Sequence, residues 1–225
     1  MEAKLTEDYL VEQSAINWLK EIDYLYIEGS ALSPECGERD SYRQVVLKNR
    51  FIRAIKRINP WLDNDSAKEV YKKIIELEHP DFVIKSKLFY EMLVHGVKIT
   101  IKDRREERTK IAKIIDYENP ENNEFLVANQ FTVEYQYQRN LTRRPDMVVF
   151  INGLPIAVFE FKSFNANETA KDAFYDHKEK MKDIPQLYIY AQFVVASDGV
   201  ETKYGSPMSD WERFFVWEGI DDDND

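Results

Sequence analysis

Two acidic residues and a lysine lie close together in the middle of the chain. Asp146 stands at the start of one β-rich segment, and Glu160 and Lys162 stand near the end of the next. Because side chains alternate along a strand, Glu160 and Lys162 share one face, while Phe159 and Phe161 take the opposite, core face. Two carboxylates can hold Mg²⁺, a hard cation that prefers oxygen ligands. The trio predicts metal-assisted phosphodiester hydrolysis, in which the lysine orients the attacking water or neutralises the transition state.

The register of the hairpin between these residues decides whether the two carboxylates meet. A plain two-residue loop at Asn152-Gly153 puts Asp146 opposite Phe159, on the wrong face. A three-residue connection or a one-residue bulge instead brings Asp146 opposite Glu160. The hypothesis of a shared metal site therefore requires one of these two irregularities. The alternative is an exposed hairpin face with a cross-strand ion pair.

A helix near the N-terminus carries another carboxylate. Thr6 is a suitable N-cap, and Glu12 falls on the same face as an apolar stripe formed by Ala15, Ile16, Leu19 and Ile22. One interpretation is a charge at the edge of the stripe that reaches solvent. The other is a buried carboxylate, which needs a partner.

The remaining patterns predict a mixed α/β protein. Helices are expected at roughly 41–58, from Ser66 onward, at 85–95 and at 167–182. Strands are expected at 24–27, 97–101, 111–115, 125–137, 146–151, 155–162, 192–197 and 200–204, with a charged turn at 104–108. We predict a single domain over residues 1–220, with a helical insert at about 38–96 after the first helix. Residues 221–225 are expected to be an acidic tail or the start of a linker.

Composition limits the class of protein. The 225 residues are 44% hydrophobic and 32% charged, which fits a soluble globular chain, and no apolar run is long enough to span a membrane. Cys36 is the single cysteine, which excludes a disulfide framework or a multi-cysteine metal site and fits the cytoplasm. The net charge of −10 repels nucleic acid, so DNA binding requires a local basic patch, a divalent metal or a partner.

The segments Arg144-Pro145-Asp146 and Glu160-Phe161-Lys162, with residues 151–155 between them, resemble the nuclease motif of the PD-(D/E)xK superfamily. More narrowly, the chain resembles the N-terminal domain of the R (restriction) subunit of type I restriction–modification enzymes. Further segments carry this resemblance along nearly the whole chain, namely residues 38–43, 59–60, 119–123, 125–127, 129–133, 197–199 and 210–213.

The resemblance implies that the single domain over residues 1–220 is endonuclease-like, with a PD-(D/E)xK restriction-endonuclease-like core, a mixed central sheet flanked by helices. It assigns Asp146 and Glu160 as ligands of Mg²⁺, with Mn²⁺ as a substitute, and the Phe161 carbonyl as a further ligand. It makes Lys162 the catalytic lysine and Glu12 the glutamate that the first helix contributes near the site.

One part of the family pattern differs here. The family usually has Gln-x-x-x-Tyr on the helix after the Glu-x-Lys strand, whereas Asp176 and Lys180 stand at those positions. An acid and a lysine four residues apart are also an ordinary helix-surface pair. Lys180 is a candidate DNA contact, together with Arg139, Arg143 and Arg144, which lie just before Asp146 in the sequence. The alternative for the arginines is that they are exposed to solvent and contact no phosphate.

The resemblance implies a nuclease domain that cuts duplex DNA after translocation by a motor that is not on this chain. The sequence has no Gly-x-x-x-x-Gly-Lys-Ser/Thr loop, so ATP is expected only in the full-length subunit. The implied partners are duplex DNA, the motor domains of the same subunit, and the methyltransferase and specificity subunits. The alternative is a non-catalytic docking domain of the same subunit. His177 shares a helical face with apolar residues and is expected to be packed rather than a ligand.

Overall fold

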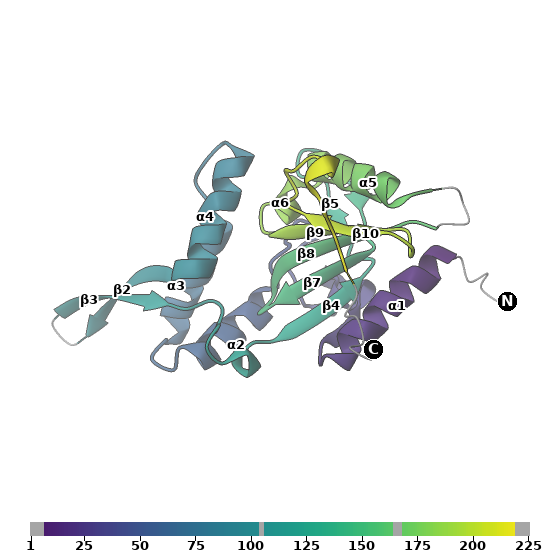
Figure 1. Cartoon of the computed structure of the whole chain (residues 1–225). Helices are drawn as coiled ribbons and strands as arrows, with labels where there is room; N and C mark the ends of the chain where they lie inside the picture. The colour runs from purple at the N-terminus through teal and green to yellow at the C-terminus, as the bar shows by residue number, and fades with distance from the viewer. Residues whose placement is uncertain (1–6, 104–105, 164–167, 219–225) are drawn as a thin grey trace.

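The computed structural model describes residues 7–103, 106–163 and 168–218. A mixed sheet of seven strands lies at its centre, in the order β1-β4-β7-β8-β9-β10-β11 (Figure 1). The strands are β1 Leu25–Glu28, β4 Phe125–Asn129, β7 Met147–Ile151, β8 Leu154–Phe161, β9 Phe193–Ser197, β10 Thr202–Gly205 and β11 Phe215–Val216. The pairs β1–β4 and β8–β9 are parallel, and the other neighbours are antiparallel. The expected mixed sheet is confirmed.

Helices cover the two faces of this sheet. Helix α1 (Glu7–Glu21) packs Ile16 against Phe159 and Phe161 on one face. Helix α5 (Ala170–Asp183) packs on the other face, which includes Val158. Strand β8 is therefore buried at every position, as expected for a central strand covered on both sides. The face that carries Glu160 is thus a second core face.

Three helices lie in the region where a helical insert was expected, and a hairpin follows them. The helices are α2 Lys48–Ile58, α3 Asn64–Ile75 and α4 Phe82–His95, and the hairpin consists of β2 Val97–Asp103 and β3 Glu106–Ala112. Figure 1 shows α4 and this hairpin extending away from the central sheet. Short elements of the described part are η1 Gly29–Leu32, η2 Pro34–Cys36, η3 Pro120–Asn122, β5 Val133–Glu134, β6 Thr142–Arg143, α6 Pro185–Tyr188 and η5 Trp211–Arg213. No helix in the three described ranges is both long and apolar enough to cross a bilayer.

Several helix boundaries differ from the sequence prediction. Helix α3 begins before Ser66, because Asp63 is its N-cap and accepts a hydrogen bond from the Ser66 N–H at 2.7 Å. Helix α4 likewise begins at Phe82, capped by Asp81. The helix expected from residue 41 begins only at Lys48. The preceding segment is held by other contacts, including a 2.9 Å bond from the Leu47 N–H to the Gly153 carbonyl.

Other expectations were wrong in detail. Ile22 is not part of the buried stripe; it is 65% exposed because α1 ends at Glu21. The strand expected at 125–137 is broken at Gln130, whose φ is +50°. Strand β3 includes residues 106–108, which were expected in a turn, and ends at Ala112. Thr6, residues 104–105, the helix start at 167 and the tail at 221–225 lie outside the described residues.

Candidate active site

The hairpin between the two candidate carboxylates contains the irregularity that a shared site requires. Asn152 and Gly153 form a two-residue turn, both with positive φ (54° and 77°). Near the turn Phe150 pairs with Pro155, whereas farther along Met147 pairs with Phe159. The register shifts by one residue between Val149 and Phe150, so β8 has a bulge. Continuing the shifted register by one residue places Asp146 opposite Glu160.

Asn152 fixes this turn against the rest of the fold. Its side chain is fully buried and makes three hydrogen bonds. Its Oδ1 accepts from the Glu124 N–H at 2.8 Å, and its Nδ2 donates to the Ile114 carbonyl at 2.9 Å and to Asn123 Oδ1 at 2.8 Å. Because buried polar atoms are costly unless they are paired, these contacts hold the hairpin in one position. Asn152 and Asn123 therefore stabilise the scaffold of the site.

Glu160 is almost completely buried, with 1% of its surface exposed. Its Oε2 accepts a short hydrogen bond from the Lys180 ammonium, and its Oε1 has no hydrogen-bond partner among the described residues. Burial raises the pKa of Glu160 well above its ordinary value, and the nearby charge of Asp146 raises it further, against the opposing effect of Lys180. The alternative of an exposed hairpin face is therefore wrong for this residue.

Asp146 lies one residue before β7 and is held by two groups. Its Oδ2 accepts a hydrogen bond from the Phe161 N–H at 2.8 Å, which ties it directly to the Glu-x-Lys strand. Its Oδ1 lies 3.4 Å from the amide nitrogen of Gln130. Asp146 is half-buried, so one carboxylate of the pair remains reachable from solvent.

Lys162 extends from the end of β8 toward α5. Its Nζ lies 2.9 Å from Asp176 Oδ2 and 3.4 Å from Glu168 Oε1, and its side chain is 18% exposed. Burial lowers the pKa of Lys162, but the hydrogen bonds and charges of Asp176 and Glu168 outweigh it, so the pKa lies above its ordinary value. Lys162 is thus charged at neutral pH and is held by two acidic side chains, Glu168 and Asp176.

Glu12 is buried rather than exposed to solvent, with 6% of its surface accessible. Its two carboxylate oxygens accept hydrogen bonds from the side-chain amides of Asn129 and Gln130, each at 2.8 Å. Since the Gln130 amide also lies near Asp146, it connects Glu12 to the candidate site. The buried interpretation of Glu12 is the one that the structure supports.

Asn129 and Gln130 are functional candidates to which the sequence analysis assigned no role at the site. Gln130 has a φ of +50°, and its backbone N–H donates to the Asp146 carbonyl at 2.7 Å. A Cβ at Gly29 would lie 2.2 Å from the Asn129 carbonyl oxygen, so only glycine allows this close approach. The sequence signal that could have identified them is a pair of polar amides at the end of an apolar strand.

Helix α5 places its own charged pair over the Glu-x-Lys strand. Asp176 contacts Lys162 and Lys180 contacts Glu160, so the expectation of an ordinary surface pair between Asp176 and Lys180 is wrong. Asp198 anchors the start of this helix, because its Oδ2 accepts from the Ala170 N–H at 3.1 Å. Ser197, at the end of β9, accepts from the Lys162 N–H through its carbonyl at 2.8 Å.

His177 is packed, as expected. It is 2% exposed, its Nε2 lies 2.9 Å from the Val195 carbonyl, and its Nδ1 lies 3.1 Å from the Tyr188 hydroxyl. A carbonyl only accepts, so Nε2 carries the proton and the hydroxyl of Tyr188 donates to Nδ1. Burial lowers the pKa of His177 to about 3.

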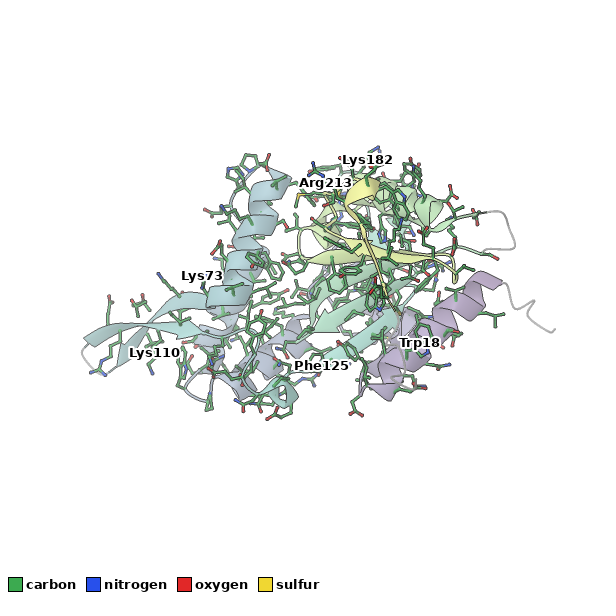
Figure 2. The ribbon with its side chains drawn as sticks, viewed as in Figure 1. Trp18, Lys73, Lys110, Phe125, Lys182 and Arg213 are labelled. Carbon is green, nitrogen blue, oxygen red and sulfur yellow. The ribbon has the colours of Figure 1, made fainter. Side chains whose placement is uncertain are left out.

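The candidate DNA contacts differ in exposure and in their partners. Arg139 and Arg144 are exposed, while Arg143 pairs with Asp183 at 2.7 Å. Lys180 has a side chain that is only 14% exposed. Figure 2 shows other basic residues in separate regions, Lys73 and Lys110 on the insert and hairpin, and Lys182 and Arg213 near α5. A role of these side chains in DNA binding stays a prediction.

The carboxylate oxygens of Asp146 and Glu160 are ligands of the kind that fits a hard divalent cation. Among the described residues no group of three or more His, Cys, Asp or Glu side chains forms a metal cluster. A site here therefore depends on Asp146, Glu160 and backbone or water oxygens. The partnerless, buried Oε1 of Glu160 is an oxygen donor of the kind that Mg²⁺ prefers.

Comparison with known proteins decides the family. The family model described as the N terminus of the type I restriction enzyme R protein matches residues 4–213. The chain belongs to this family. A relative from Methanocaldococcus jannaschii, provisionally named type I restriction enzyme MjaIXP endonuclease subunit, is 62% identical over 99% of this chain. The type I restriction enzyme HindI endonuclease subunit of Haemophilus influenzae is 28% identical over 95% of it.

The alignments cover only part of these relatives. This chain of the R protein N-terminus family corresponds to 21% of the M. jannaschii protein and 20% of the H. influenzae protein. It thus spans about a fifth of the length of the endonuclease subunits that it resembles.

Proposed function

We propose that this domain is the Mg²⁺-dependent nuclease of a type I restriction enzyme R subunit, with a PD-(D/E)xK active site that hydrolyses phosphodiester bonds in duplex DNA. The observation that carries the proposal is the buried Glu160, whose Oε1 has no hydrogen-bond partner within the described part of the chain. The register of β7 and β8, extended by one residue, places Glu160 opposite Asp146. A carboxylate in this position is costly unless a cation or a donor compensates it. The names of the relatives, which are endonuclease subunits, support the same activity.

Each site residue has a defined task in this proposal. Asp146, oriented by the Phe161 N–H, and Glu160 Oε1 would hold the cation, together with the Phe161 carbonyl. The bound cation supplies Lewis-acid activation of a water and of the phosphoryl oxygens. Lys162 would orient the attacking water or stabilise charge on the phosphate. Glu12 acts through Gln130, which it keeps directed at Asp146.

The complete enzyme would supply the remaining functions. We propose that the motor domains lie in the part of the subunit that this chain does not span, that they use ATP, and that the methyltransferase and specificity subunits select the DNA. The second candidate function is a non-catalytic docking domain in the same cytoplasmic complex. It is favoured by the Asp176 and Lys180 pair, which replaces the usual family residues and occupies both Glu160 and Lys162.

Metal binding separates the two candidates. We expect the 225-residue chain to bind one Mn²⁺ saturably, measured by calorimetry or by electron paramagnetic resonance. Asp146→Asn and Glu160→Gln keep the side-chain shape but remove a charged ligand, so each should weaken binding by at least about 100-fold. Asp65→Asn, at an exposed acid on α3, is the matched control and should leave affinity unchanged. Absence of saturable binding both by the wild-type chain and by its Lys180→Gln variant would favour the docking domain.

DNA affinity of the isolated chain is expected to be low. Phosphate contacts dominate non-specific binding, and here 41 acidic side chains outnumber 31 basic ones. We expect a dissociation constant of about 100 μM or weaker for a duplex at about 150 mM salt in a gel-shift titration. Attachment to a motor on the same DNA would compensate by raising the effective concentration. Binding in the nanomolar range would instead reveal a basic groove that the charge distribution does not suggest.

A further inference from the structure

Strand β8 and helix α5 are joined by two crossed ion pairs. Glu160 lies on the strand and Lys162 directly follows its last residue, while Lys180 and Asp176 are four residues apart on the helix. Each strand residue contacts the helix residue of opposite charge, so both charges of the catalytic motif are already neutralised in this state. Both helix residues are also partly buried, because their ion pairs lie between α5 and the sheet.

The two oxygens of Glu160 are in different situations. Oε2 is taken by the Lys180 ammonium, while Oε1 is buried and has no hydrogen-bond partner among the described residues. A second cation at Oε1 would share one carboxylate with an ammonium that is itself only 14% exposed. Two cations on one poorly solvated carboxylate repel strongly, because water screens them little.

We propose that Lys180 is a resident cation of this site, which compensates Glu160 in the metal-free protein and against which a divalent metal ion must compete. The inference rests on the proposed function, because it assumes that Glu160 is a metal ligand. Lys180 is then a positioning residue: it holds the carboxylate in place for the metal but lowers the affinity of the site for it. The metal-free domain remains stable, and tight metal binding requires a further source of negative charge, such as the phosphates of the DNA substrate.

Asp176 has the opposite sign and provides an internal control. It forms the second crossed pair with Lys162, so its loss also removes one ion pair between β8 and α5. Asp176→Asn, however, removes a negative charge from the neighbourhood of the metal ligands. The inference therefore requires that Asp176→Asn, which also removes an ion pair of α5, does not tighten metal binding as the neutral Lys180 variants do.

The test is a Mn²⁺ titration of the chain at about pH 8.5, followed by calorimetry. Lys180→Met and Lys180→Gln should each bind Mn²⁺ at least about 10-fold more tightly than the wild-type chain, since the competing charge is gone. Lys180→Arg keeps the charge and should stay within about three-fold of wild type, and Asp176→Asn should bind equally or more weakly. Melting temperature provides a second readout: Mn²⁺ should raise that of Lys180→Gln by more than that of the wild type.

The outcomes distinguish this inference from the proposed function. If the wild-type chain binds Mn²⁺ and the neutral Lys180 variants bind it no more tightly, Lys180 does not compete and the inference is wrong, while the nuclease proposal stands. If no variant binds Mn²⁺, both are wrong. Should both neutral variants fail to fold, the test is a Mg²⁺ titration of the wild-type chain followed by NMR. A saturable shift of the Lys180 side-chain signals, absent in Glu160→Gln, supports the inference. Unchanged signals in the wild-type chain overturn it.

Discussion

Asp146→Ala, Glu160→Ala and Lys162→Ala should each abolish DNA cleavage by the assembled restriction enzyme, with a loss of at least about 1,000-fold. The two carboxylates are the acidic side chains that the hairpin bulge brings opposite each other, so loss of either leaves one charged ligand. In the proposed reaction, loss of Lys162 removes the positive charge that would stabilise the reacting phosphate. Cleavage is measured on a circular duplex that contains the recognition site.

ATP hydrolysis stimulated by DNA should survive in all three variants, because we place the motor in a different part of the subunit. Asp65→Ala and Lys68→Ala alter an exposed acid and an exposed lysine on α3 and should cleave normally. Glu160→Ala also removes the partner of Lys180, so its folding must be verified by circular dichroism. A folded Lys162→Ala enzyme that cuts at the wild-type rate would contradict the role of this lysine.

His177 should make the stability of the domain sensitive to acid. Its pKa is depressed to about 3 in the folded chain, so between pH 6.5 and 3 the unfolded chain binds the proton more readily. The stabilisation by neutral His177 is thus fully present above pH 6.5 and is lost as the pH falls through this window. Each pH unit inside this window costs on the order of 1 kcal/mol of unfolding free energy, so acidification from pH 6.5 to 4.5 should cost about 2 kcal/mol.

The measurement is urea unfolding of wild type and His177→Gln at both pH values. The wild-type chain should lose about 2 kcal/mol more than the variant, and because Glu160 titrates in both, its opposite contribution cancels. His95→Gln changes an exposed histidine on α4 and should behave like wild type. Equal acid sensitivity of wild type and His177→Gln would show that this imidazole is not the responsible group.

Local patterns predicted the parts of the site that depend on local geometry. Strand periodicity put Glu160 and Lys162 on one face, and the Asn-Gly pair predicted the turn. The hydrophobic stripe put Glu12 on the buried side of α1. The spacing between Asp146 and Glu160 also showed that a shared site needs a bulge or a longer loop. It did not determine which of the two was present, because both bring Asp146 opposite Glu160.

Contacts between distant segments could not be predicted in this way. Asn129 and Gln130 meet Glu12 only because β4 and α1 pack together, across more than a hundred residues of chain. The pairs of α5 with β8 depend on the rotation of that helix over the sheet, which Asp198 helps to fix. A helix considered alone favours its own i,i+4 pair, and tertiary packing overrode that preference.

The bulge in β8 also determines which changes in length the hairpin can absorb. Ile156 has no partner in the β7–β8 ladder, so β8 holds one residue more than regular pairing needs. Deleting one residue between Ile156 and Glu160 can be accommodated by closing the bulge, and Glu160 then stays opposite Asp146. Strand β7 has no extra residue, so the deletion of one residue there moves Asp146 opposite Phe159. Within this family, insertions and deletions should therefore be tolerated unequally on the two strands, with the segment before the turn nearly constant in length.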